Sequence, residues 1–306
     1  MKELLFLTLC WLCVVAEDTG QPAGLMADCP GMNRTTKLSE ETKRSLSVVV
    51  AYPSSGLFGY KETRCKLSIE GAACTAKHLD LTEGKTQVMI SGYMDGSFSP
   101  MVRSFMALYL GIGRNVIVLE IFPILVRSYP IAARITKPLG ELLGEYLASL
   151  TFQGLSPKRL ELVGASLGAH IASFASDTYH QLTGRRPARL TGEYQTAIKG
   201  DFIMPCFQLC SHVRSAFYWL LSYNNPDKFL AVQCDSVADA RIGNCYEDTI
   251  RTNTLGPKTN FSKPGVYYLP TNAKAPYYMG LNGLKKRKFG VNDYLMMPAP
   301  DEDMVI

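Results

Sequence analysis

The stretch LELVGASLGAH, residues 160–170, decides the fold. An apolar run of strand length leads into the pattern Gly-x-Ser-x-Gly centred on Ser166, and the residues that follow predict a helix closed by Gly184. Small residues on both sides of a serine let the chain turn sharply and lift the hydroxyl above the strand end. The helix N-terminus favours a developing negative charge there. The pattern predicts a nucleophilic serine; the alternative is a packing turn in which Ser166 is only a small residue.

The neighbouring segments alternate between strand and helix patterns. We expect strands over residues 86–92, 115–122, 160–165 and 188–192, and helices over 99–111, 131–150 (kinked at Pro138) and 167–184. Residues before Thr86 are expected to be rich in loops. Further on, residues 211–223 predict a helix, and 229–234 and 265–270 predict strands. Such alternation implies right-handed crossovers, so the expected fold class is α/β with a mainly parallel sheet and helices on both faces.

The N-terminal sequence and the composition indicate where the protein is located and which classes of partner it can bind. Residues 1–16 combine Lys2, an apolar run and a small residue before Glu17, which predicts a secretory signal peptide and a secreted protein. No other run approaches the roughly 18 apolar residues of a membrane-spanning helix. The net charge of +5 owes part to the basic run 285–288, and no basic stripe with interleaved aromatics predicts nucleic-acid binding. We expect one domain over residues 17–280 and a polar, disordered tail over 281–306.

The cysteines predict a disulfide framework. Seven of the nine lie beyond the signal peptide, and neighbours in sequence suggest three pairs, with Cys29 left over. The suggested pairs are Cys65 with Cys74, Cys206 with Cys210, and Cys234 with Cys245. The four-residue spacing of Cys206 and Cys210 leaves another pairing open because strain disfavours very short loops. No histidine pair has zinc-ligand spacing, so no metal or other cofactor is expected. Asn33 and Asn260 begin N-glycosylation sequons.

A nucleophilic serine needs a base and an oxyanion hole. In this architecture the chain order is serine, acid, histidine, and of the four histidines His212 fits best, since His170 and His180 follow the serine on its own helix. His212 is expected at a helix start beside Cys210; its alternative is a helix-capping surface histidine. The backbone N–H groups of Leu167 and Tyr93 are the candidate oxyanion donors.

At these residues the sequence resembles the secreted pancreatic-lipase family of α/β-hydrolases, especially its arthropod lipases and phospholipases A1. The resemblance runs from KTQVMISGYMDGSFSP through NVIVLEIF and LELVGASLGAH to PARLTG, and resumes at CFQLCSHVRS and AVQCDSVADARIGNCY. It implies Ser166 as nucleophile, His212 as base, and Tyr93 and Leu167 as oxyanion donors. It also implies lipid esters or lipid surfaces as partners.

The chain departs from the family where the catalytic acid is expected. Relatives continue the strand matching ARLTG into a Leu-Asp-Pro-Ala segment, whereas this chain continues with EYQTAIKGDF, so the fold is truncated relative to the family. Glu193 is the best substitute acid. Only three residues separate Cys206 from Cys210, where lipases of the family carry a long lid, so an active site would be open. We expect neither the C-terminal β-sandwich of vertebrate members nor a colipase-like partner.

Two functions from different classes follow. The first is a secreted hydrolase of acylglycerols or phospholipids; the second is a catalytically inactive lipid-binding or storage protein, a use that this family has in insect yolk. The missing acid segment distinguishes these two functions, because a hydrolase needs the acid and a lipid-binding protein does not. A third possibility is a transcript or gene model that skips the acid-bearing segment.

Overall fold

The computed structural model describes residues 36–54, 59–127, 129–193, 205–236, 239–240, 244–246, 249–272 and 274–285. For Pro130, Glu193 and residues 205–214 it describes the backbone alone. The described residues fall into two compact units, one made by residues up to Glu193 and the other by residues from Pro205 onward. Within these ranges no helix is both long and apolar enough to cross a membrane. The expected signal peptide, Cys29 and Asn33 lie outside them.

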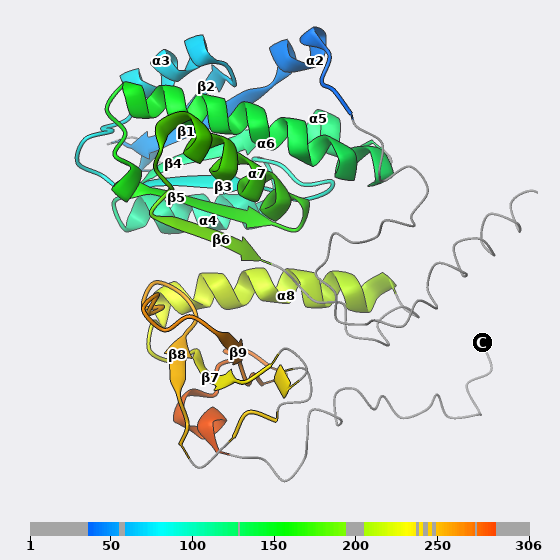
Figure 1. Ribbon diagram of the computed structural model, residues 1–306, viewed down its shortest axis with the longest axis vertical. Coiled ribbons are helices and arrows are strands. Elements are labelled where there is room, and N and C mark those ends of the chain that lie inside the picture. The colour runs from blue at the N-terminus through cyan, green and yellow to red at the C-terminus, as the bar shows by residue number, and fades with distance from the viewer. Residues whose placement is uncertain are drawn as a thin grey trace, which may run out of the picture. The chain divides into compact units, whose positions relative to one another are not determined.

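A six-stranded sheet with strand order β2-β1-β4-β3-β5-β6 forms the centre of the first unit (Figure 1). The strands are β1 (Ser47–Pro53), β2 (Tyr60–Lys66), β3 (Thr86–Ile90), β4 (Asn115–Glu120), β5 (Leu160–Ala165) and β6 (Arg189–Glu193). Strands β4, β3, β5 and β6 are parallel, whereas β1 runs antiparallel to both β2 and β4. The predicted mainly parallel sheet is confirmed.

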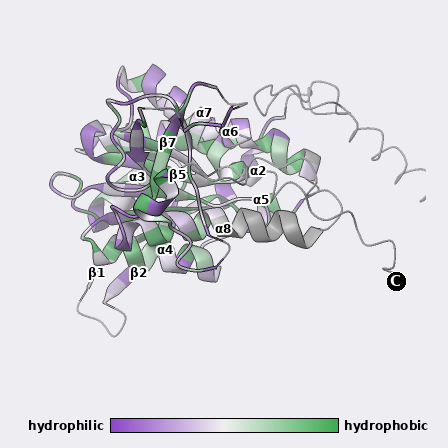
Figure 2. Cartoon of the chain, turned by 90° about the horizontal axis from the view of Figure 1, so that it is seen from below, coloured by the Kyte–Doolittle hydropathy of each residue, from purple (hydrophilic) through white to green (hydrophobic). Residues whose placement is uncertain are grey.

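Helices cover both faces of this sheet. Helices α3 (Ile69–His78), α6 (Tyr129–Phe152) and α7 (Leu167–Thr183) lie on one face, and α4 (Pro100–Gly111) lies on the other (Figure 1). Every residue of β3 and β4 is therefore buried, which explains their continuous apolar runs. Helix α4 carries hydrophobic and hydrophilic residues along its length (Figure 2), as a helix lying on a sheet does. The α/β fold class is confirmed.

Helices α6 and α7 approach each other closely at two glycines of α6. A Cβ added to Gly140 would lie 2.7 Å from the carbonyl oxygen of Ile171, and one added to Gly144 would lie 2.6 Å from the Cβ of Thr178. Only glycine fits at these positions without movement of α7. Pro138, the expected kink, lies inside α6.

The prediction that residues before Thr86 are rich in loops is wrong for the described residues 36–54 and 59–85. They form α2 (Glu40–Ser45), the β1–β2 pair and α3. Strand β1 buries the run Val48–Ala51 between its two neighbours. Strand β2 is the sheet edge and is mostly polar, so no apolar period marks it in the sequence. Its pairing with β1 is a tertiary contact that overrides weak local signals.

The second unit contains α8 (Pro205–Asn224) and an antiparallel sheet with order β8-β7-β9. Its strands are β7 (Leu230–Cys234), β8 (Thr252–Thr254) and β9 (Val266–Tyr268). Helix α8 begins six residues before the predicted 211, because Pro205 suits the first turn of a helix. His212 therefore lies inside α8, not at its start. The short 3₁₀ helix η3 (Gly280–Leu284) packs beyond the expected tail boundary, with Gly283 buried and its carbonyl accepting from the Tyr246 hydroxyl at 2.8 Å.

Two of the three predicted disulfides are confirmed. Cys65 in β2 bonds to Cys74 in α3, and Cys234 at the end of β7 bonds to Cys245. Each closes a short loop within one unit. The third predicted pair, Cys206 with Cys210, falls in the part of α8 where only the backbone is described, and stays a prediction.

Candidate active site

Ser166 occupies a strained turn between β5 and α7. Its backbone has φ 54° and ψ −124°, a combination that costs a residue with a Cβ free energy and that is found mainly at functional sites. The turn lifts Ser166 out of the strand at the carboxyl end of β5, and the residue is half-buried. A sharp strand-to-helix turn with a serine at its apex is the nucleophile elbow of α/β-hydrolases.

The two glycines of the pattern permit this turn because the chain crosses itself at close range. A Cβ on Gly164 would lie 2.6 Å from the Cα of Ala169, and one on Gly168 would lie 2.6 Å from the carbonyl oxygen of Ser91 in the adjacent strand segment. The pattern Gly-x-Ser-x-Gly is therefore a steric requirement of the elbow packed on β3.

The segment after β3 lies against the serine. Strands β3 and β5 are parallel neighbours, with Ile90 opposite Gly164, so the chain leaves both strands at the same edge of the sheet. A Cβ on Gly92 would lie 2.8 Å from the Cβ of Ser166 and 3.5 Å from its Oγ. The backbone at Gly92 thus runs beside the hydroxyl. The Leu167 N–H belongs to the first turn of α7, where an N–H has no partner within its own helix.

The structure describes only the backbone of the predicted acid, Glu193, and of the predicted base, His212. Glu193 is the last residue of β6, and its backbone pairs with Ala165, the residue before Ser166. The end of β6 thus adjoins the elbow, although the Glu193 side chain is not described. His212 lies in α8 of the second unit, with only its backbone described. The contact of either side chain with Ser166 stays a prediction.

His170 lies one helical turn after Ser166 on α7. The side chain is half-buried, and burial lowers its pKa below the ordinary histidine value. Burial thus favours the neutral form of this imidazole.

Sequence analysis missed the residues that hold the segment after β3. The connection 91–99 contacts the end of β4, where the Ser97 hydroxyl donates to the Glu120 carboxylate. Both side chains are buried. A carboxylate that ends the otherwise apolar run NVIVLE was the available signal for this contact.

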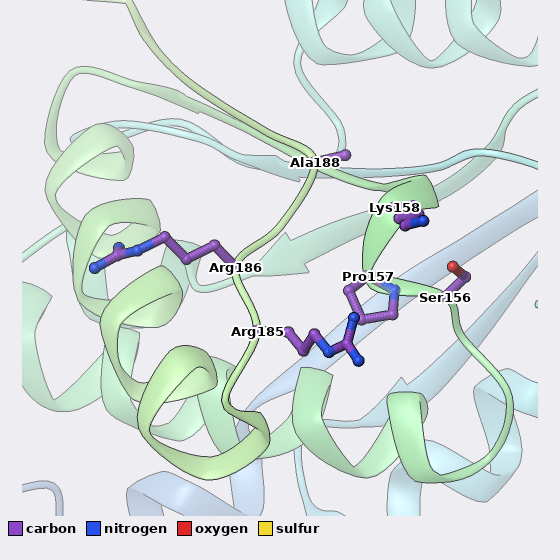
Figure 3. Close-up of a pocket in the computed structure, with 6 residues that line it drawn as sticks. All are labelled: Ser156, Pro157, Lys158, Arg185, Arg186 and Ala188. Carbon is purple, nitrogen blue, oxygen red and sulfur yellow. The ribbon is translucent and has the colours of Figure 1, made fainter.

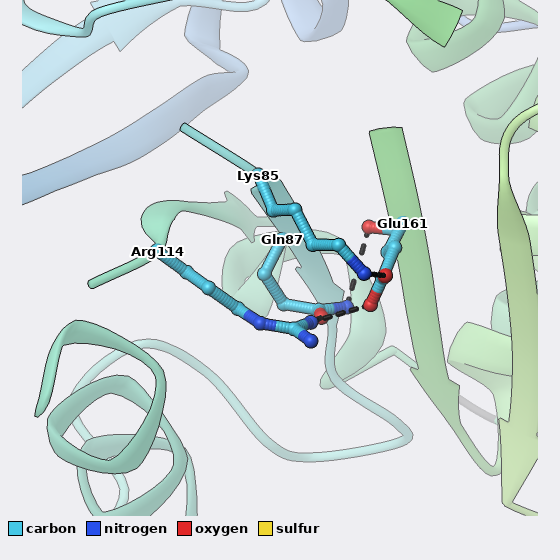
Figure 4. Close-up of polar contacts among 4 residues, drawn as sticks. All are labelled: Lys85, Gln87, Arg114 and Glu161. Atoms are coloured by element: carbon cyan, nitrogen blue, oxygen red, sulfur yellow. Dashed lines mark hydrogen bonds and ion pairs between the residues drawn. The ribbon is translucent and has the colours of Figure 1, made fainter. Parts of the chain in front are cut away.

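A second polar cluster ties the amino ends of three parallel strands together (Figure 4). Glu161 of β5 accepts from Lys85 at 2.8 Å and from the Arg114 guanidinium, which also donates to Gln87 of β3 at 2.7 Å. Burial alone would raise the pKa of Glu161, but the hydrogen bond from Lys85 and the Arg114 charge outweigh burial and hold the pKa below the ordinary value. This cluster lies at the amino ends of the parallel strands, whereas Ser166 lies at the carboxyl end of β5.

A pocket of about 470 Å³ also lies at this amino-terminal edge, beside η1 (Pro157–Arg159) (Figure 3). It is lined by Ser156, Pro157, Lys158, Arg185, Arg186 and Ala188. The Arg185 side chain extends toward Pro157, whereas Arg186 points away (Figure 3) and pairs with Asp177 at 3.4 Å. The pocket is remote from the elbow along the strand direction, and we assign it no part in the chemistry. No cluster of metal-ligating side chains occurs in the described part of the chain.

A mainly parallel sheet with a strained serine between a strand and a helix defines the α/β-hydrolase class. Residues 56–200 match the family model described as Lipase. This match covers just under half of the chain and agrees with the resemblance to the pancreatic-lipase family.

Curated lipases share a distant similarity with this chain. It is 25% identical over 299 residues to lipase member H of Rattus norvegicus, covering 80% of this chain and 62% of that protein. It is 24% identical over 289 residues to lipase member H of Mus musculus, covering 77% of this chain and 60% of that protein. A phospholipase A1 of Dinoponera quadriceps is 36% identical over 82 residues, which cover 27% of this chain and 20% of that protein. The chain thus spans about three fifths of the lipase member H relatives.

Proposed function

We propose that this chain is a secreted carboxylic ester hydrolase that acts on acylglycerols or phospholipids. Ser166 is the nucleophile, His212 the general base, and the N–H groups of Tyr93 and Leu167 the oxyanion donors. The observation that carries the proposal is the strained backbone of Ser166, with Gly92 packed directly against its side chain. Strain of this kind persists only where the surrounding structure enforces it.

The reaction proceeds through an acyl-enzyme. The Ser166 Oγ attacks the acyl carbonyl while His212 takes the hydroxyl proton, and the carbonyl oxygen becomes an oxyanion that accepts from the two N–H groups. His212 then gives the proton to the departing alkoxide, which leaves as an alcohol. Water, deprotonated by the same imidazole, attacks the acyl-enzyme, releases the fatty acid and restores the Ser166 hydroxyl.

We propose Glu193 as the acid that orients His212. Its backbone lies at the carboxyl end of β6, opposite Ala165, which is the edge where the elbow leaves the sheet. An acid in this role holds the imidazole tautomer and stabilises the imidazolium, and its loss lowers serine-protease catalysis by about 10⁴-fold. Glu193→Gln is therefore expected to reduce turnover by a comparable factor.

Apolar side chains near the elbow support a lipid substrate. Met94, Phe98, Val126 and Tyr129 are 44–63% exposed. Met94 and Phe98 lie on the connection after β3, Val126 on the connection after β4, and Tyr129 is the first residue of α6. These connections contact each other, since the Tyr93 and Tyr129 rings pack edge to face at 5.2 Å and the Phe98 and Phe122 rings at 4.8 Å. A group of exposed apolar side chains beside a reactive serine suits a lipid surface.

Secretion and processing belong to the same proposal. The two disulfides suit an oxidising compartment. Asn260 lies in an exposed turn, where its side-chain oxygen accepts from the Ser262 N–H at 2.9 Å, so its sequon is open to glycosylation. We further propose that residues 1–16 are a signal peptide and that both units together make one hydrolase domain.

A fluorophosphonate probe tests the proposal. The secreted chain and Ser166→Ala are treated with the probe and assayed for release of fatty acid from emulsified triglyceride and from phospholipid vesicles. We expect labelling and turnover in the chain and neither in Ser166→Ala. A correctly folded chain without labelling would refute the hydrolase.

The absent Leu-Asp-Pro-Ala segment favours a second candidate, an inactive lipid-binding or storage protein. This candidate predicts that the folded chain retains lipid after purification, shows no turnover, and is unchanged in lipid content by Ser166→Ala. Sequencing the transcript across Gly192 and Glu193 tests separately whether a segment has been skipped.

A further inference from the structure

We propose that Glu120 is a positioning residue that, through Ser97, holds the connection between β3 and α4 against the elbow. We call residues 91–99 the oxyanion loop because it carries Tyr93. The inference rests on the proposed function, since it concerns how the Tyr93 N–H is kept beside Ser166. Glu120 itself does not touch Ser166; it is the last residue of β4, two strands away from β5 in the sheet.

A continuous path of contacts runs from Glu120 to Gly92. The Ser97 hydroxyl donates to the Glu120 carboxylate, and the exposed fractions of these residues are 3% and 8%. A Cβ on Gly96 would lie 3.2 Å from Glu120 Oε1, so the loop backbone passes directly over the carboxylate. The Asp95 carboxylate accepts from the Gly96 N–H at 2.8 Å, and the Asp95 N–H donates to the Gly92 carbonyl at 3.3 Å.

Two further hydrogen bonds hold the loop on the segment after β4. The Met94 N–H donates to the Leu125 carbonyl at 3.3 Å, and the Tyr93 hydroxyl donates to the Arg127 carbonyl at 3.0 Å. Both acceptors are backbone oxygens that a substitution leaves in place. Glu120 is therefore the acceptor side chain through which the loop position can be tested.

The charge of Glu120 is only partly compensated. Among the described residues it pairs with Arg64 of β2, at 4.0 Å, whose side chain is 61% exposed. A buried carboxylate costs free energy that an apolar residue in the same space would not. An apolar residue could not accept the Ser97 hydrogen bond, however, and a directional bond fixes a loop position that packing alone leaves free to slide.

The experiment compares Ser97→Ala, Glu120→Ala and Glu120→Gln in the full chain. Readouts are the fluorophosphonate labelling rate, kcat and KM on a dispersed ester, and hydrogen–deuterium exchange of peptides covering residues 91–99. We expect Ser97→Ala and Glu120→Ala to lower labelling and kcat by roughly 10- to 100-fold with KM little changed, less than complete removal of an oxyanion donor costs. Glu120→Gln, which keeps an acceptor, should recover part of the rate. Hydrogen–deuterium exchange in residues 91–99 should become faster, and most so in the variant that loses the most labelling rate and kcat.

The matched control is Thr75→Val. It removes the buried hydrogen bond between Thr75 of α3 and Tyr146 of α6, away from the loop. We expect it to lower the melting temperature without changing labelling or exchange in residues 91–99. Folded Ser97→Ala and Glu120→Ala with wild-type labelling and exchange would overturn the positioning role and leave the hydrolase standing. If the unsubstituted chain is not labelled, the hydrolase fails, and unchanged exchange would then also refute the role of Glu120.

Discussion

Replacing Ser166 by glycine tests the elbow independently of any activity. A residue with a Cβ at φ 54° and ψ −124° carries about 1–3 kcal/mol of strain, which glycine does not. Glycine lowers the free energy of unfolding by about 0.5–1 kcal/mol relative to alanine, because it increases the entropy of the unfolded chain. We therefore expect Ser166→Gly to be more stable than Ser166→Ala by about 1 kcal/mol, since alanine keeps the Cβ. For a folding unit of this size the difference corresponds to about 3 °C in Tm.

The assay is thermal and urea unfolding of the two variants, with Ala165→Gly as the matched control. Ala165 precedes the serine in β5 and is not among the residues with positive φ, so glycine there should lower stability by about 0.5–1 kcal/mol. Glycine should therefore raise stability relative to alanine at position 166 and lower it relative to alanine at position 165. This difference between neighbouring positions would indicate a strained backbone at Ser166. If Ser166→Gly is less stable than Ser166→Ala, the elbow is unstrained and the structural argument for a nucleophile is lost.

Other predictions concern stability alone. Glu161→Gln should lower stability at pH 7 by about 1–3 kcal/mol. The pKa of Glu161 is lower in the folded state, so its contribution to the free energy of unfolding is present above the unfolded pKa of about 4.3 and is lost as pH falls through the folded pKa. Urea unfolding at several acidic pH values should therefore show that the stability of Glu161→Gln falls less steeply with pH than that of the unsubstituted chain. Gly144→Ala should destabilise by about 1–3 kcal/mol by overpacking α6 on α7, whereas Gly111→Ala, where an added Cβ meets nothing within 4 Å, should be neutral or stabilising; equal melting temperatures would contradict the close helix contact. Breaking the bond between Cys234 and Cys245 with a serine pair should cost roughly 3 kcal/mol, measured as a shift in the urea midpoint, and no shift would show that the loop is held by other contacts.

The parallel core and the elbow could be predicted from the sequence because each leaves a local signature. Strands covered on both faces carry near-continuous apolar runs, and β3, β4 and β5 have them at Val88–Ile90, Val116–Leu119 and Leu162–Ala165. Helix ends were marked by Ser99, whose hydroxyl accepts from the Val102 N–H, and by Gly184, which adopts φ 69°. The strained turn at Ser166 follows from the two flanking glycines.

The remaining features depend on contacts between distant parts of the chain, which local patterns do not encode. Strand β2 is polar because it lies at an edge, and only its pairing with β1 makes it a strand. The contact between Ser97 and Glu120 joins residues 23 positions apart. The start of α8 was misplaced by six residues because Cys206–Cys210 was interpreted as a short disulfide loop, whereas the helix begins at Pro205.

The placement of Lys158 has a practical consequence. This amine is exposed on η1, just before β5 begins, while Ser166 stands just after β5 ends. Coupling the protein to a bead or sensor chip through a tag fixed at residue 158 would turn the serine outward to an applied emulsion. Lipid capture and ester cleavage could then be recorded on the same immobilised molecules.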